Sequence, residues 1–252
     1  MPDDVRKLGG WLLQGDWPAV SCPNCGLGFV AVDHISTINS AASDRVRDDP
    51  DWEPEWLFGH FHGTLRCSRS ACYEPIIVSG AYRVEPIIEE GGRFYNEYGS
   101  YLRLRYAIPA LPIMSVPPAT PKVVQDAVVA ASRIVWTDPS GAGNRLRVAI
   151  EDLLTEYGMR RFINTKGKRK RLSTHDRIQE FKKYESLAGE TLEAVKWIGN
   201  QATHGQELSV DDVLDGAGLL EYALKLLYDT SDDEVAKLVR KINKSKGLPR
   251  RR

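Results

Sequence analysis

The sequence SCPNCG, at residues 21–26, is followed further along the chain by RCSRSAC, at residues 66–72. These two stretches hold all four cysteines of the protein, Cys22, Cys25, Cys67 and Cys72. Four thiolates complete the tetrahedral shell of a zinc ion and leave no position open for water, which is typical of a structural site. Clustered cysteines in a reducing compartment also favour metal over disulfides. The sequence therefore predicts a structural Zn²⁺ ion that organises a small β-rich domain.

The surroundings of the second cysteine pair leave two alternatives open. Arg66 and Arg69 flank the pair, where they could offset the negative charge of a four-thiolate centre or contact phosphate. His60 and His62 are possible substitute ligands, but they alternate with Phe61 and so share one strand face. We favour a partly exposed strand for these histidines.

Residues 1–118 are predicted to form this β-rich, zinc-binding domain. Runs rich in β-branched and aromatic residues predict strands at residues 29–35, 60–67, 74–88 and 101–108. In the last run, strict alternation predicts a single apolar face made of Leu102, Leu104, Tyr106 and Ile108.

Residues 119–252 are predicted to form a helical bundle. A proline-rich connector precedes it, with prolines at positions 109, 112, 117, 118 and 121. Beyond Pro121 the apolar residues recur with helical spacing, and Asp138-Pro139 is a typical helix start. The fold class expected from this order is α+β, with a zinc-ribbon-like β domain before an all-α bundle.

The zero net charge of the chain hides an asymmetry between the two halves. Residues 1–118 contain five more acidic than basic residues, and residues 119–252 contain five more basic than acidic residues. No apolar run approaches the length of a membrane span, and the first fifteen residues do not resemble a secretory signal. We therefore expect a cytoplasmic protein without a membrane partner.

One segment of the helical half is strongly basic. Residues 159–171 contain no acid and seven basic residues, namely Arg160, Arg161, Lys166, Lys168, Arg169, Lys170 and Arg171. Lacking an apolar period, the segment is predicted to be a solvated loop. Its charge could bind the phosphates of RNA or DNA, or could complement the negative end of the preceding helix. The tail INKSKGLPRRR, residues 242–252, is either a similar arm or a frayed end.

The stretch WIGNQATHG, residues 197–205, is predicted to end an amphipathic helix. Leu192, Val195 and Ile198 form its core stripe, whereas Trp197, Asn200 and His204 fall on the opposite side. An exposed tryptophan beside polar groups indicates a dimer interface or a ligand surface.

LRVAIEDLL (146–154) and WIGNQATH (197–204) resemble the bacterial domain of unknown function 4145, whose members often carry an N-terminal Cys-x-x-Cys element. That family is similar to the HEPN helical bundles. The resemblance implies a homodimer and a place among toxin–antitoxin and phage-defence systems, where many HEPN proteins are metal-independent ribonucleases. Their motif is an arginine and a histidine separated by four to six intervening residues. Here His204 and the polar Asn200 match, but no arginine stands in the expected place.

The site residues follow from this comparison. His204 and Asn200 are the candidate catalytic pair, with the basic Lys196 outside the usual spacing. Arg147 and Glu151, one helical turn apart, are candidates for the opposite wall or form an ordinary surface ion pair.

The missing arginine favours a non-catalytic binding or adaptor protein of bacterial antiviral defence or nucleic-acid metabolism. A ribonuclease with an atypical site and a structural dimerisation subunit are the alternatives. The expected partners are a second copy of the chain, RNA or DNA, and a protein of a defence system.

Overall fold

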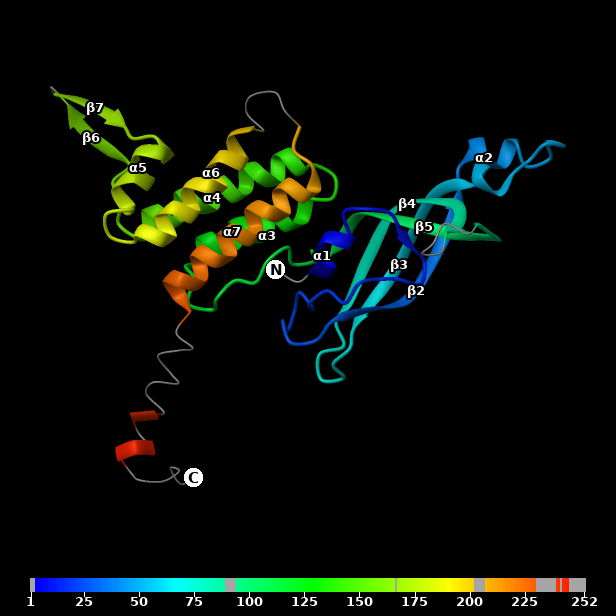
Figure 1. Cartoon of the computed structure of the whole chain (residues 1–252), viewed down its shortest axis with the longest axis horizontal. Helices are drawn as coiled ribbons and strands as arrows, with labels where there is room; N and C mark the ends of the chain where they lie inside the picture. The colour runs from blue at the N-terminus through cyan, green and yellow to red at the C-terminus, as the bar shows by residue number, and fades with distance from the viewer. Residues whose placement is uncertain are drawn as a thin grey trace.

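The computed structural model describes residues 3–88, 94–165, 167–201, 207–229, 239–240 and 242–244. A single antiparallel sheet occupies the first half of the chain, and helices follow it. Figure 1 shows the sheet at one end of the molecule and the helices at the other. The predicted α+β class is confirmed.

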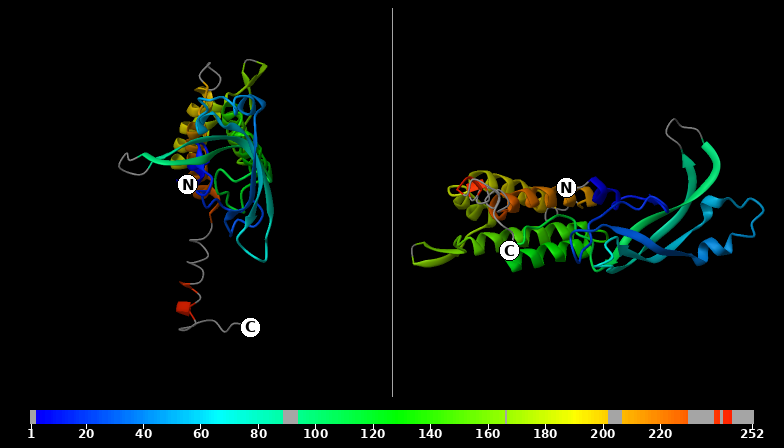
Figure 2. Two further views of the ribbon diagram at one scale, coloured as in Figure 1. Left: turned by 90° about the vertical axis from the view of Figure 1, so that its right-hand side faces the viewer. Right: turned by 90° about the horizontal axis from the view of Figure 1, so that it is seen from below.

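The sheet is five-stranded, with the order β1-β5-β4-β3-β2 and antiparallel pairing throughout. Its strands are β1 (Leu12–Leu13), β2 (Val30–Asn39), β3 (Phe58–Cys67), β4 (Pro75–Ile88) and β5 (Phe94–Ile108). Short helical segments accompany it: α1 (Asp3–Lys7), α2 (Ala41–Arg45) and η1 (Pro54–Trp56). Each long strand contains or overlaps one of the four predicted runs, and Figure 2 shows these strands as a twisted, curved layer.

One face of the sheet supplies the core of the first half. Phe61 and Leu65 of β3, Ile76 and Val78 of β4, and Leu102 of β5 are almost fully buried. His60 and His62 alternate with Phe61 and are exposed on the other face. The interpretation of these histidines as residues of a partly exposed strand is therefore confirmed.

A β-bulge in β5 overturns part of the predicted strand face. Ser79 pairs with Tyr106 and Gly80 pairs with Leu104, so Arg105 has no partner of its own. An extra residue reverses the direction of every side chain beyond it. Leu104 is therefore buried as predicted, but Tyr106 and Ile108 are 56% and 70% exposed. Their placement on the same face as Leu104 was wrong.

Five helices within the described residues make up the bundle of the second half. They are α3 (Lys122–Ile134), α4 (Pro139–Glu156), α5 (Thr174–Phe181), α6 (Ser186–Gln201) and α7 (Val210–Tyr228). Helix α4 contacts all four of the others, so it lies at the centre of the bundle. Its start is as predicted, because the Asp138 side chain accepts a hydrogen bond from the amide of Gly141. No helix in the described ranges is long and apolar enough to cross a bilayer.

The basic segment forms a hairpin, so the prediction of an irregular loop within an all-α bundle was wrong. Strand β6 (Phe162–Thr165) pairs with β7 (Lys168–Arg171) through a two-residue connection. Gly167 in this connection has a φ of +75°, which glycine adopts at little cost and which suits a tight hairpin turn. The Arg169 guanidinium lies 3.9 Å from the ring centroid of Phe162, and this cross-strand contact stabilises the pair.

Contacts join the first half of the chain to the bundle. Arg6 in α1 forms an ion pair with Asp215 in α7. In the proline-rich connector, the Ser115 amide donates to the buried carboxylate of Glu221, at 3.1 Å. The predicted connector is therefore packed against α7 at this point.

Gly80 and Gly218 provide a matched test of the bulge. A Cβ atom at Gly80 would lie 2.0 Å from the Arg103 carbonyl oxygen, whereas one at Gly218 in α7 would meet nothing within 4 Å. We expect Gly80→Ala to lower the free energy of unfolding by about 1–3 kcal/mol. Gly218→Ala should raise it by about 0.5–1 kcal/mol through helix propensity. Urea unfolding measures both, and equal effects would contradict the tight packing at the bulge.

Candidate functional site: a four-cysteine metal centre

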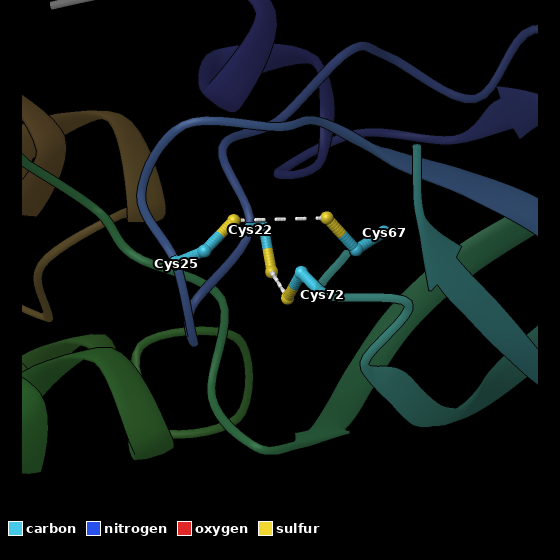
Figure 3. Close-up of side chains that lie close together, drawn as sticks. All are labelled: Cys22, Cys25, Cys67 and Cys72. Atoms are coloured by element: carbon cyan, nitrogen blue, oxygen red, sulfur yellow. Dashed lines mark hydrogen bonds between the residues drawn. The ribbon is translucent and has the colours of Figure 1, made fainter. Parts of the chain in front are cut away.

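Two loops carry the cysteines to one place. Cys22 and Cys25 lie in the loop that leads into β2, and the Ser21–Phe29 bridge closes that loop. Cys67 ends β3, and Cys72 lies in the turn before β4. The antiparallel pairing of β2 with β3 brings the start of one strand beside the end of the other, with Val30 opposite Cys67. Figure 3 shows the four side chains converging from these loops.

The sulfur atoms have the spacing of a tetrahedral metal site. The Sγ atoms of Cys22 and Cys72 are 3.8 Å apart, and those of Cys25 and Cys67 are 3.7 Å apart. All four sulfurs lie within 4.8 Å of one another. Zn–S bonds of about 2.3 Å require a tetrahedral edge of about 3.8 Å, so the donor set fits zinc. The four thiols are free cysteines.

Backbone amides in the first loop stabilise negative charge on the Cys25 sulfur. Hydrogen bonds from the amides of Leu27 and Gly28 lower the pKa of Cys25 to about 6. Gly26 has a φ of +63°, which allows the loop to turn these amides toward the sulfur. Burial raises the pKa of Cys22. A bound divalent cation would favour the thiolate form of all four residues.

The hydrogen bond from the Arg69 amide lowers the pKa of Cys67, but burial and the neighbouring thiols raise it, to about 12 overall. Four adjacent thiols cannot all ionise without a cation, which explains the contrast with Cys25.

The arginines beside the second pair have separate roles. The Arg66 Nε atom donates to Asp33 at 2.8 Å, and its guanidinium lies 4.8 Å from the centroid of the Tyr73 ring. Asp33 thus neutralises Arg66, which makes it a poor counterion for the thiolates. For Arg69, the backbone supplies the main contacts, because its carbonyl accepts hydrogen bonds from the amides of Cys72 and Tyr73.

The structure brings together only some of the residues proposed for the candidate catalytic site around His204. Arg147 and Glu151 form an ion pair on α4, with Nε and Oε1 3.6 Å apart. Lys196 is buried, and its ammonium lies 3.6 Å from the ring centroid of Trp197. Asn200 belongs to α6, but its side chain and the whole of His204 lie outside the described residues.

The outward face of α6 is exposed at Trp197 but covered nearer its start. Trp197 is 56% exposed, as predicted. One turn earlier, Glu193 forms an ion pair with Lys182, at 2.7 Å, and accepts a hydrogen bond from Gln179 of α5. On this side of α6, the turn before Trp197 is therefore an interhelical contact.

Sequence reasoning missed the burial of a charged residue of α5. Arg177 of α5 is 3% exposed, yet it takes a core position beside Ile178 and one turn before Phe181. A basic residue on an apolar stripe was the available signal. Arg177 lines a cavity together with Arg147 and Glu151 and with Arg161 and Arg171 of the basic segment.

Both halves of the chain match known families of uncharacterised domains. Residues 129–246 match the family model described as domain of unknown function DUF4145. The resemblance predicted for the helical half is confirmed to this extent. Residues 12–106 match a second such family, DUF8608. No curated protein and no solved structure matches the chain.

We expect one zinc ion per chain, bound by the four cysteines. The Cys22→Ser/Cys67→Ser double variant should lose the metal, because oxygen replaces two of the four sulfur ligands. Elemental analysis of protein purified without chelators measures the zinc content. His60→Ala/His62→Ala is the matched control and should retain a full equivalent. Zinc that persists in the cysteine variant would refute the ligand set.

Proposed function

We propose that this protein is a non-catalytic binding or adaptor protein that contacts nucleic acid through the β6–β7 hairpin. The observation that carries the proposal is the form of this hairpin. It projects from the end of the bundle that lies away from the sheet (Figure 1). Lys168, Arg169, Lys170 and Arg171 follow one another along β7, and all four are exposed.

Charge and shape together favour phosphate contacts at this hairpin. Residues 159–171 contain no acid, so little opposes the basic side chains locally. Exposed lysine and arginine side chains on a projecting ribbon can reach the phosphates of RNA or DNA and release their counterions. Such contacts position a strand without reading its sequence, which suits an adaptor.

Several features favour binding over ribonuclease activity. Trp197, Ile198 and Gly199 occupy the positions where the HEPN motif requires arginine. Lys196 is buried against the Trp197 ring, which makes it a poor substitute. Without a cation at the site, a phosphate that develops charge lacks its main stabilising partner. Metal-independent RNA cleavage that disappears in His204→Ala would instead establish the ribonuclease.

We further propose that the four-cysteine region is a zinc-ribbon-like element and that the bundle is HEPN-like. The resemblance of residues 146–154 and 197–204 supports the second statement and a role in bacterial antiviral defence, with a defence protein as partner. The exposed Trp197 supports a homodimer. A purely structural dimerisation role would require this interface but not the hairpin.

The hairpin predicts salt-dependent binding of RNA or DNA. Lys168→Glu/Lys170→Glu should weaken binding about tenfold or more and reduce the slope of log K against log salt by about 1–2. Fluorescence anisotropy with single-stranded RNA and duplex DNA at several salt concentrations measures both quantities. Arg133→Glu/Lys183→Glu, at two exposed positions elsewhere on the bundle, is the charge-matched control. Equal losses in the two variants would count against the hairpin.

If the protein forms a dimer through Trp197, substitution of this residue should separate the dimer into monomers. Trp197→Glu places a charge in the proposed interface and should give monomers in sedimentation velocity at tens of micromolar, roughly the range where a specific interface holds. Phe58 is an exposed aromatic residue of the sheet, so Phe58→Glu is the control and should leave the sedimentation coefficient unchanged. A wild type that is already monomeric there would exclude the proposed interface.

A further inference from the structure

A cavity of about 290 Å³ lies where α4, the foot of the hairpin and the start of α5 meet. Among the described residues, its lining includes Arg147, Glu151, Arg161, Arg171, Thr174 and Arg177. Four guanidinium groups and one carboxylate therefore belong to this lining. Such an excess of one charge, gathered in a concave site, raises the local concentration of anions.

Arg177 is the deepest of these cations and has only neutral partners. Its Nη1 atom donates to the Glu151 carbonyl at 3.2 Å, and its Nη2 atom donates to Thr155 Oγ1 at 2.8 Å and to the Met159 carbonyl at 3.3 Å. Its Nε atom is buried and has no acceptor among the described residues. Burying a guanidinium beside neutral groups is costly, and an anion that enters the cavity would offset the cost.

The carboxylate of Glu151 already interacts with three side chains around the cavity. It accepts a hydrogen bond from Thr174 Oγ1 at 2.6 Å, and it lies 3.6 Å from Arg147 and 3.7 Å from Arg171. The two ion-pair distances exceed those of direct charge-assisted hydrogen bonds, which are about 2.7–2.9 Å. Glu151 therefore does not form a close ion pair with either of these two arginines.

Burial and the neighbouring arginines disfavour the ionised form of Arg177. Burial, followed by the charge of Arg161, lowers the pKa of Arg177, and Arg171 acts in the same direction. Glu151 and Asp152 of α4 oppose this shift without cancelling it. An anion in the cavity would oppose it further, because a nearby opposite charge favours the ionised form.

We infer that this cavity binds a phosphate monoester, either the terminal phosphate of a nucleic-acid strand or that of a free nucleotide. A monoester is a dianion near neutral pH and presents three oxygens to the guanidinium groups, which bind phosphate in a bidentate manner. Arg177 is 3% exposed, so only a group that projects into the cavity can reach it. A terminal phosphate projects in this way, whereas a phosphodiester carries a nucleoside on both sides.

The start of α5 borders the cavity. Thr174 is the first residue of this eight-residue helix, and Ser173 is its N-cap, whose amide and hydroxyl donate to the Asp176 carboxylate. For a strand as ligand, the inference rests on the proposed function, because Arg161 and Arg171 belong to the basic segment. For a free nucleotide, it stands without that function.

The test is calorimetric titration of the full chain with four probes. These are inorganic phosphate, adenosine 5′-monophosphate, and one RNA oligonucleotide with either a 5′-phosphate or a 5′-hydroxyl end. Arg171→Gln lies at the exposed rim and should fold normally, and Arg177→Lys tests the buried position with its charge retained. Lys168→Gln/Lys170→Gln, on the same hairpin but outside the cavity lining, is the control.

We expect the phosphorylated probes to bind the wild type and to lose about tenfold or more in affinity in Arg171→Gln and Arg177→Lys, as charge-assisted hydrogen bonds are lost. The control should bind adenosine 5′-monophosphate normally. If both oligonucleotides bind equally and neither small phosphate binds, the cavity inference fails while the proposed function stands. If the nucleotide binds and no oligonucleotide does, the cavity inference stands and the proposed function fails. Unchanged nucleotide binding in both arginine variants would also overturn the inference.

Discussion

The close approach of four cysteines from two separate loops is the constraint on which the first half of the protein depends. The sulfur–sulfur distances between the loops are 3.7 and 3.8 Å. The loops precede β2 and join β3 to β4, so the cluster fixes one end of three neighbouring strands. Strand β2 is at the edge of the sheet and pairs only with β3. A metal bound by the four thiolates would link the two loops and so hold β2 in register with β3. Its binding energy would contribute directly to folding.

Helix α4 has the corresponding role in the second half. It contacts every other helix of the bundle, and its polar side carries Arg147 and Glu151 toward the hairpin and α5. The Glu151 carbonyl accepts from Arg177, while the Glu151 side chain accepts from Thr174. These contacts fix α5 against α4 and shape the arginine-lined cavity. The cysteine-bearing loops and the basic hairpin lie in different halves of the chain, and these halves have net charges of opposite sign.

For several residues that the sequence singles out, the surrounding side chains change the role that the residue can have. Lys196 stands near Asn200 and His204 in the sequence, but burial against Trp197 makes it part of the packing. Arg66 flanks Cys67, but its guanidinium forms an ion pair with Asp33. Arg177, in contrast, lies on an apolar stripe of the sequence and becomes the buried cation of a cavity.

The sequence by itself determined the features that depend on local spacing. The two cysteine pairs, the long strands with their β-branched runs, and the start of α4 at Asp138-Pro139 are visible in the sequence, because each depends on neighbouring residues. The convergence of the two cysteine pairs, in contrast, depends on the pairing of β2 with β3. Only the tertiary structure decided the rest. The bulge at Arg105 depends on pairing with β4, and the arginine-lined cavity depends on residues from 147 to 177 meeting across three elements. Long-range packing, which no local pattern encodes, sets which charges are buried together and which side chains face water.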